Sequence, residues 1–179
     1  MDTNNKSEIL QALTRLHDEI DRQVAVLTFL HGERLKCGRG CNSCCVDDLT
    51  IFEVEAENIR FHHADILENG EPGMVGNCPF LAAEGNCRIY SHRPYVCRTQ
   101  GIPLRWIEEY EGGEDREEVL EYRDICPLNE EGEPIEELPE DACWTLGPIE
   151  GRLAALQIEL GGNDLRRIAL RELFRKRRE

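Results

Sequence analysis

Cysteines dominate the reactive side chains of this 179-residue chain. Nine are present, and four of them fall within the nine residues from Cys37 to Cys45. Gly38 and Gly40 relax the backbone between the first two. The ninth, Cys143, stands apart and is predicted to be a buried or spare thiol. The eight cysteines that we predict to bind metal are Cys37, Cys41, Cys44, Cys45, Cys78, Cys87, Cys97 and Cys126.

Thiolates are soft donors, and four of them around a zinc ion or an iron–sulfur cluster make a closed site. Eight ligands would fill two such sites, or one site with ligands in reserve. Cys126-Pro127 resembles the cysteine-proline pair that closes cluster motifs in bacterial ferredoxins. Zinc and an iron–sulfur cluster remain equally good predictions for the cofactor on these grounds.

The spacing of the thiols predicts how their site forms. A tight turn can aim Cys41 and Cys44 at one point, but the gaps that follow Cys45 are much longer. Ligands so scattered meet only when the chain folds, so we expect metal binding and folding to be coupled. Disulfides are disfavoured, because the count is odd and adjacent cysteines bridge only with backbone strain.

Two arginines flank the last cysteines of the set. Arg93 and Arg98 are predicted to contact the cofactor, because a guanidinium lowers the pKa of nearby thiols and can donate hydrogen bonds to sulfur. They could also hold an anionic substrate. The structural alternative is that both pair with the acidic segment further along the chain. Tyr90, nearby, is predicted to be a core residue.

The elements that position these thiols are predicted to be mainly α-helical. Apolar residues recur at steps of three and four through residues 7–36, which predicts a long amphipathic helix. Thr50 and Glu53 form a capping box that would open a second helix. A helical pair is predicted after Pro148. We therefore expect a small irregular helical domain, in which cysteine-rich loops pack against long N- and C-terminal helices.

The middle of the chain is predicted to lack long regular elements. Residues 77–103 are expected to form loops and short helices around the metal, and 117–123 a short helix in an otherwise broken acidic stretch. Residues 108–141 carry a local net charge of −14, whereas 166–178 carry +6. These runs are either solvated surface, or a basic end that docks on the acidic segment or on an acidic partner.

Composition limits the class of protein. A formal net charge of −15 argues against broad nucleic-acid binding. The N-terminus has no basic and apolar signal pattern, and no apolar run approaches the roughly 20 residues of a membrane span. We therefore expect no membrane partner and a cytoplasmic location, where thiols stay reduced. One domain is expected, made of a helix (1–36), a metal-binding region (37–127) and an acidic loop with the helical pair (128–179).

Several motifs of the cysteine region together match one family pattern. They are Cys41-x2-Cys44-Cys45, Cys78-Pro79-Phe80-Leu81, Cys87-x-Ile89-Tyr90, Arg93-Pro94-x2-Cys97-Arg98 and the later Cys126. Over residues 37–127 the chain resembles the YkgJ-type CxxCxxCC cysteine-cluster family, whose members are described as zinc- or iron-chelating proteins. It departs from that family at its first spacing, because three residues separate Cys37 from Cys41 where the family usually has two.

The resemblance implies that the cysteines chelate zinc or iron, with an iron–sulfur cluster as one form of the cofactor. Two classes of function follow. The first is a cytosolic metal-binding protein, and the second is a small iron–sulfur enzyme that performs redox or group-transfer chemistry on a small or protein substrate. No residue is assigned a catalytic role, and the sequence identifies no protein partner.

Overall fold

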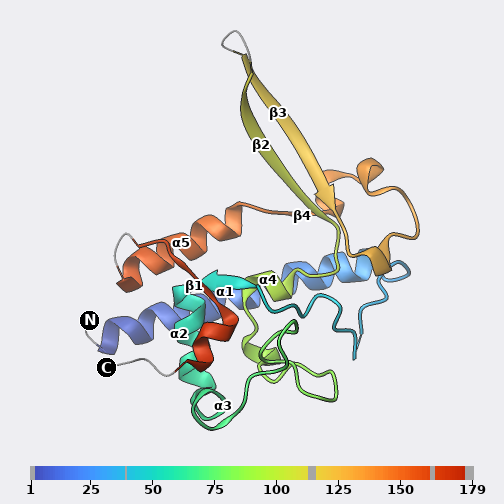
Figure 1. The fold of residues 1–179 in the computed structure, drawn as a ribbon. Helices are drawn as coiled ribbons and strands as arrows, with labels where there is room; N and C mark the ends of the chain where they lie inside the picture. Colours follow the sequence, from blue (N-terminus) through green and yellow to red (C-terminus); the bar gives the residue numbers. More distant parts are fainter. Residues whose placement is uncertain (1–2, 39, 113–115, 162–163, 176–179) are drawn as a thin grey trace.

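Three helices form the main body of the protein. The computed structural model describes residues 3–38, 40–112, 116–161 and 164–175. The long helices are α1 (Thr3–Leu30), α2 (Glu53–His62) and α5 (Pro148–Gly161), and Figure 1 shows α5 running beside α1. The short helices are α3 (Ala64–Asn69) and α4 (Tyr95–Arg98), with single 3-10 turns at Tyr90–His92, Pro127–Asn129, Ile135–Glu137, Glu140–Ala142 and Leu170–Phe174.

The main hydrophobic core lies between these helices. Its α1 members are spaced three, four or seven residues apart, as on one face of a helix, and two of them, Leu13 and Ile20, are completely buried. Leu153 of α5 meets them from the other side. The chain between α4 and α5 closes the core, where Trp144 donates a hydrogen bond to the Tyr95 hydroxyl at 2.8 Å.

A second, smaller core lies under the cysteine-rich loops. It is built on the antiparallel pair of β1 (Thr50–Phe52) and β5 (Arg167–Ala169), and Phe80 is completely buried within it. Cys45 and Cys87 pack against this core and are themselves only partly buried. The loops that carry the thiols therefore have an apolar base, which fixes their position relative to α2.

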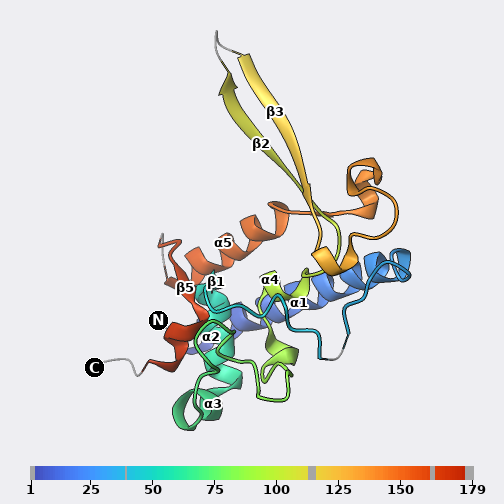
Figure 2. The same ribbon diagram turned by 45° about the vertical axis from the view of Figure 1, so that its right-hand side comes forward.

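A β-ribbon projects from the body of the molecule. Strands β2 (Leu104–Gly112) and β3 (Arg116–Asp124) pair antiparallel, and short β4 (Trp144–Thr145) pairs with β2 only at its base. Figures 1 and 2 both show the outer part of the ribbon pointing away from the helices. β3 is the edge strand of this sheet in the described part of the chain.

The predicted mainly α-helical class is wrong, because two small sheets are part of the fold. The acidic stretch that we expected to be broken, with a helix at 117–123, forms the β-ribbon instead. Its aromatic and β-branched residues, Trp106, Ile107, Tyr110, Val119 and Tyr122, favour a strand, although they do not alternate regularly with the charged residues. Gly112 and the glycine that follows it in the sequence are a typical hairpin signal between two such runs.

The predicted C-terminal helical pair is also wrong in its second member. The chain after Asp164 forms β5 and a 3-10 turn, because pairing with β1 supplies its backbone hydrogen bonds. The first predicted helix ends at Leu30 rather than at residue 36. There the chain turns, and the His31 imidazole bonds the Ala142 carbonyl oxygen at 2.7 Å, which ties this end of α1 to the acidic loop.

None of the helices in the described part of the chain combines the length and the apolarity that crossing a bilayer would require.

Candidate metal centre

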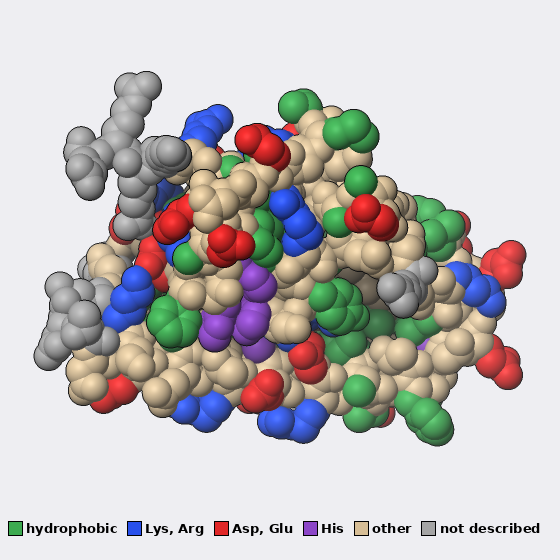
Figure 3. Space-filling model, turned by 90° about the horizontal axis from the view of Figure 1, so that it is seen from below, with side chains coloured by type: hydrophobic (Ala, Val, Ile, Leu, Met, Phe, Trp, Pro, Cys, Tyr) green, Lys and Arg blue, Asp and Glu red, His purple; other side chains and the backbone are tan. Residues whose placement is uncertain are grey.

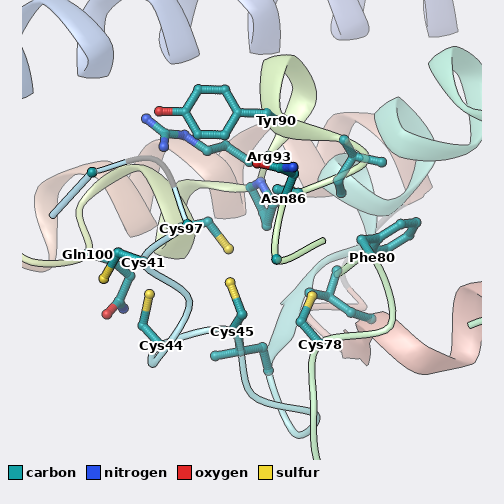
Figure 4. Close-up of a pocket in the computed structure, with 18 residues that line it drawn as sticks. Cys41, Cys44, Cys45, Cys78, Phe80, Asn86, Tyr90, Arg93, Cys97 and Gln100 are labelled. Carbon is teal, nitrogen blue, oxygen red and sulfur yellow. The ribbon is translucent and has the colours of Figure 1, made fainter. Parts of the chain in front are cut away.

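One cavity of about 520 Å³ gathers most of the cysteines. Figure 4 shows the sulfur atoms of Cys45 and Cys97 pointing toward each other, with Cys41 and Cys44 beside them and Cys78 further along the cavity. The six cysteines that line it are Cys41, Cys44, Cys45, Cys78, Cys87 and Cys97. All nine cysteines of the chain are free thiols. Segments far apart in the sequence thus converge on one space.

Backbone pairing between loops brings the first two groups of thiols together. The Cys78 N–H donates to the Cys45 carbonyl at 2.8 Å, and an isolated antiparallel bridge joins Val46 to Asn77 beside it. A second isolated bridge joins Leu81 to Cys87. These few ladder bonds hold the loops in register, so each thiol faces the cavity without a long strand to carry it.

Glu55 positions the helix that carries Cys97. Its side chain is buried, and its carboxylate accepts the N–H of Tyr95, the first residue of α4, at 2.7 Å. The same carboxylate accepts the Phe52 N–H at 3.3 Å, and it lies 3.5 Å from the His17 imidazole of α1. The predicted capping box of Thr50 with Glu53 is thus wrong. The N-cap of α2 is Phe52, and the side chain that accepts its N–H is that of Glu55.

Cys37, which is exposed, and Cys126, which is half-buried, do not line the cavity. Cys37 contacts Cys41 through a thiol hydrogen bond, and the charge of Cys126 acts on it. Asn129 is completely buried and holds this corner, because its amide nitrogen donates to Cys37 Sγ at 3.3 Å and to the Gly101 carbonyl at 2.7 Å. The eight predicted ligands therefore divide into six that face the cavity and two that flank it.

Gly101 leaves the space that the Cys37 sulfur occupies. Its φ is +94°, and a Cβ at this position would lie 2.6 Å from Cys37 Sγ. We expect Gly101→Ala to lower the free energy of unfolding by about 2 kcal/mol, because it combines a strained backbone with a steric clash. Urea denaturation measures the change.

Gly151 is the matched control for that substitution. It lies within α5, and a Cβ there would have no neighbour within 4 Å. Gly151→Ala should leave stability unchanged or raise it by up to about 1 kcal/mol, since alanine is the better helix former. Equal effects of the two substitutions would contradict the role assigned to Gly101.

Burial and neighbouring thiols set the protonation of the cavity cysteines. A hydrogen bond from Cys45, helped by the charge of Arg93, lowers the pKa of Cys44 to about 6. The same hydrogen bond and burial raise the pKa of Cys45. Burial raises the pKa of Cys97 to about 12, and it also raises the pKa values of Cys78 and Cys87. The Cys44 thiol therefore loses its proton more readily than the thiols of Cys45, Cys78, Cys87 and Cys97.

The two predicted arginines have different surroundings. Arg93 lines the cavity, and its guanidinium lies 4.4 Å from the centre of the Tyr90 ring. Arg98 is buried and faces α1, donating to Asp21 at 2.5 Å and to the Arg93 carbonyl at 2.9 Å. Only Arg93 is placed to act on a bound cofactor, while Arg98 fastens the loop to α1. Tyr90, predicted to be a core residue, is 63% exposed.

The remaining cysteine and the histidines lie outside the cavity. Cys143 is buried with its sulfur 3.9 Å from an Arg123 nitrogen. Figure 3 shows a surface patch of histidines, in which the His62 ring stacks on His92 at 3.9 Å and His63 bonds the His92 ring at 3.0 Å. His62 is exposed, and His63 and His92 are half-buried.

The donor set fits a soft metal, because every titratable side chain that lines the cavity, apart from Tyr90 and Arg93, is a thiol. A single zinc ion would need four sulfurs at about 2.3 Å from one point. Among the described residues, no three histidine, cysteine or acidic side chains are grouped closely enough to hold one ion. In the described part of the chain, the six thiols therefore line a cavity and do not converge on one point.

Comparison with known proteins finds a match, and it covers the cysteine-rich region. Residues 36–127 match the family model "CxxCxxCC: Putative zinc- or iron-chelating domain". No curated protein and no solved structure matches the chain. The matched range begins just before Cys37 and ends just after Cys126, so it contains the cavity and its flanking cysteines. Since the match covers half of the sequence, the chain belongs to the CxxCxxCC family of zinc- or iron-chelating domains.

Proposed function

We propose that the cavity thiols bind an iron–sulfur cluster and that this is a small iron–sulfur protein of the CxxCxxCC family. The observation that supports it is the arrangement of six thiols around a cavity of about 520 Å³. A cluster has several iron atoms, and thiolates bind it from different directions at its corners. Sulfurs spread around a space suit such a core better than they suit one ion.

The residues of this chain would hold the cluster and tune it. Four of the six cavity cysteines would supply thiolates, and the lowered pKa of Cys44 makes it a good first ligand. Arg93 would offset the negative charge of the thiolates and of the cluster. The apolar base formed by Phe80, Leu170 and Leu49 would exclude water from one side of the site. When bound, such a cluster supplies one-electron transfer.

The side chains that line the cavity also favour a second candidate, a redox or group-transfer enzyme. The cavity is lined beyond the thiols by polar side chains, Asn86, Gln100 and Arg93, which a simple closed metal site does not need. These groups could orient a small or protein substrate beside a cluster. The enzyme is distinguished from the plain iron–sulfur protein by a change in the cluster spectrum on adding an anionic substrate candidate, and by loss of that change in Arg93→Gln.

Anaerobic purification tests the proposal directly. The expected product is brown, contains iron and acid-labile sulfide, and absorbs in the visible range. Cys45→Ser and Cys97→Ser should each lose most of the iron and the visible absorption, because both thiols face the centre of the cavity. Cys143→Ser is the matched control and should keep both, since Cys143 lies outside the cavity.

Each outcome of that experiment decides between the metals. Colourless protein with about one zinc ion for every four thiolates would replace the cluster with a zinc site. Protein without either metal, or equal metal loss in Cys143→Ser and Cys45→Ser, would refute metal binding in the cavity. Purification under reducing, oxygen-free conditions is essential, because we expect the protein to act in the cytosol, where thiols remain reduced.

A further inference from the structure

We propose that the β2–β3 ribbon docks an extended, basic segment of a partner protein, in which arginine or lysine alternates with apolar residues. Strand β3 lies at the edge of its sheet in the described part of the chain. The N–H and C=O groups on the outer side of an edge strand are a template for a further strand. The ribbon also projects away from the helices, so a partner could reach it (Figures 1 and 2).

One face of the ribbon carries aromatic side chains, of which Trp106 and Tyr122 are half-buried and Tyr110 is exposed. The register places Trp106 opposite Tyr122, and their rings stack with centres 5.5 Å apart. Tyr110, on the same face, hydrogen-bonds the Tyr122 hydroxyl at 2.9 Å. Tyr110 and Leu120 are 41% and 46% exposed. Aromatic faces of this kind attract guanidinium and ammonium groups as well as apolar side chains.

A carboxylate completes this face. Glu108 accepts hydrogen bonds from the Trp106 indole nitrogen at 3.0 Å and from the Tyr110 hydroxyl. The carboxylate therefore lies beside the rings on which a guanidinium would stack. An arginine bound here would pair with Glu108 and cover the Trp106 ring at the same time, a combination that arginine makes better than lysine.

The negative charge of the ribbon favours a positively charged partner segment. Residues 104–124 include nine acidic and three basic residues, a net charge of −6. On the described strands, Arg105 and Arg123 are already paired with Glu121, whereas Glu108 and Glu109 are exposed. Two copies of this ribbon would repel each other, which protects the edge from self-association. A basic strand would be attracted to it.

The opposite face offers an apolar contact for the alternate side chains of that strand. Ile107 and Val119 lie on the other face from Trp106 and are 51% and 61% exposed. A two-stranded ribbon is marginally stable alone in water, and a third strand would add backbone hydrogen bonds and cover these residues. Because successive side chains of a strand point to opposite faces, both faces of the ribbon would be used.

Two doubly substituted variants test the proposal in the full-length protein. The probe is a short synthetic peptide of alternating arginine and valine, titrated while backbone amide signals are followed by NMR. Glu108→Gln/Glu109→Gln removes two charges on the ribbon, and Glu136→Gln/Glu137→Gln removes two exposed charges from the same acidic segment outside it. We expect about tenfold weaker binding for the ribbon variant and less than about twofold for the control.

The peptide chemistry provides the second comparison. A peptide of alternating arginine and serine should bind more weakly than the arginine–valine peptide, and one of alternating glutamate and valine should not bind. Equal losses in the two double variants, or signal changes that avoid residues 104–110 and 119–124, would show adventitious charge attraction and overturn the proposal. The test does not depend on the cavity, because metal content is measured separately for each variant.

Discussion

Removing the metal is expected to unfold the cysteine-rich loops while the core between α1, α2 and α5 stays folded. Structural zinc in small peptides contributes about 10–16 kcal/mol, so loss of a site of comparable strength removes more stability than the loops hold on their own. The loops are joined by isolated β-bridges rather than by long strands, and six thiols line the cavity between them. The main core uses none of the cavity cysteines, so it should persist.

Hydrogen exchange of metal-loaded and chelator-treated protein measures this result. Amides of residues 41–49 and 76–100 should exchange at least about a thousandfold faster after chelation, which corresponds to about 4 kcal/mol of lost local stability. Amides of α1 and α5 should change little. Unchanged exchange in the cysteine loops would contradict coupled metal binding and folding, and equal acceleration in α5 would mean that the whole chain unfolds as one unit.

Replacing Glu55 with alanine is expected to lower the free energy of unfolding by about 3 kcal/mol, because it leaves two N–H groups without their acceptor. These belong to Phe52, at the start of α2, and to Tyr95, at the start of α4. The loss should reach the metal centre as well, since Tyr95 begins the helix that carries Cys97. Metal affinity should therefore fall together with stability.

Urea denaturation of the metal-free and metal-loaded forms separates these two effects. Glu55→Gln keeps one oxygen acceptor and should cost less than half as much as alanine. Glu68→Ala, at an exposed position on α3, is the matched control and should change stability by less than about 0.5 kcal/mol. A loss below about 1 kcal/mol in Glu55→Ala would mean that water replaces the carboxylate and that Glu55 does not position α4.

The chemistry of the site was predictable from the sequence because it depends on residue types and short spacings. Thiol count, Cys44-Cys45 and the Arg93-Pro94-x2-Cys97 motif identified the family correctly, and the family match spans the same residues. Apolar periodicity also predicted α1, α2 and α5, although the ends of α1 and α2 were misplaced. A pattern of this kind depends only on residues within a few turns of one another, so it indicates a helix without knowledge of the tertiary contacts.

Only the tertiary structure decided which thiols share a cavity and which residues hold them there. The spacing to Cys41 sets Cys37 apart in the sequence, but only the structure shows that it lies outside the cavity, in contact with Asn129 and Gly101. The β-ribbon and the pairing of β5 with β1 were likewise missed, because acidic composition and apolar spacing suggested loops and a helix. Strand pairing and ligand convergence depend on contacts between distant segments, and a single sequence read along its length does not contain those distances.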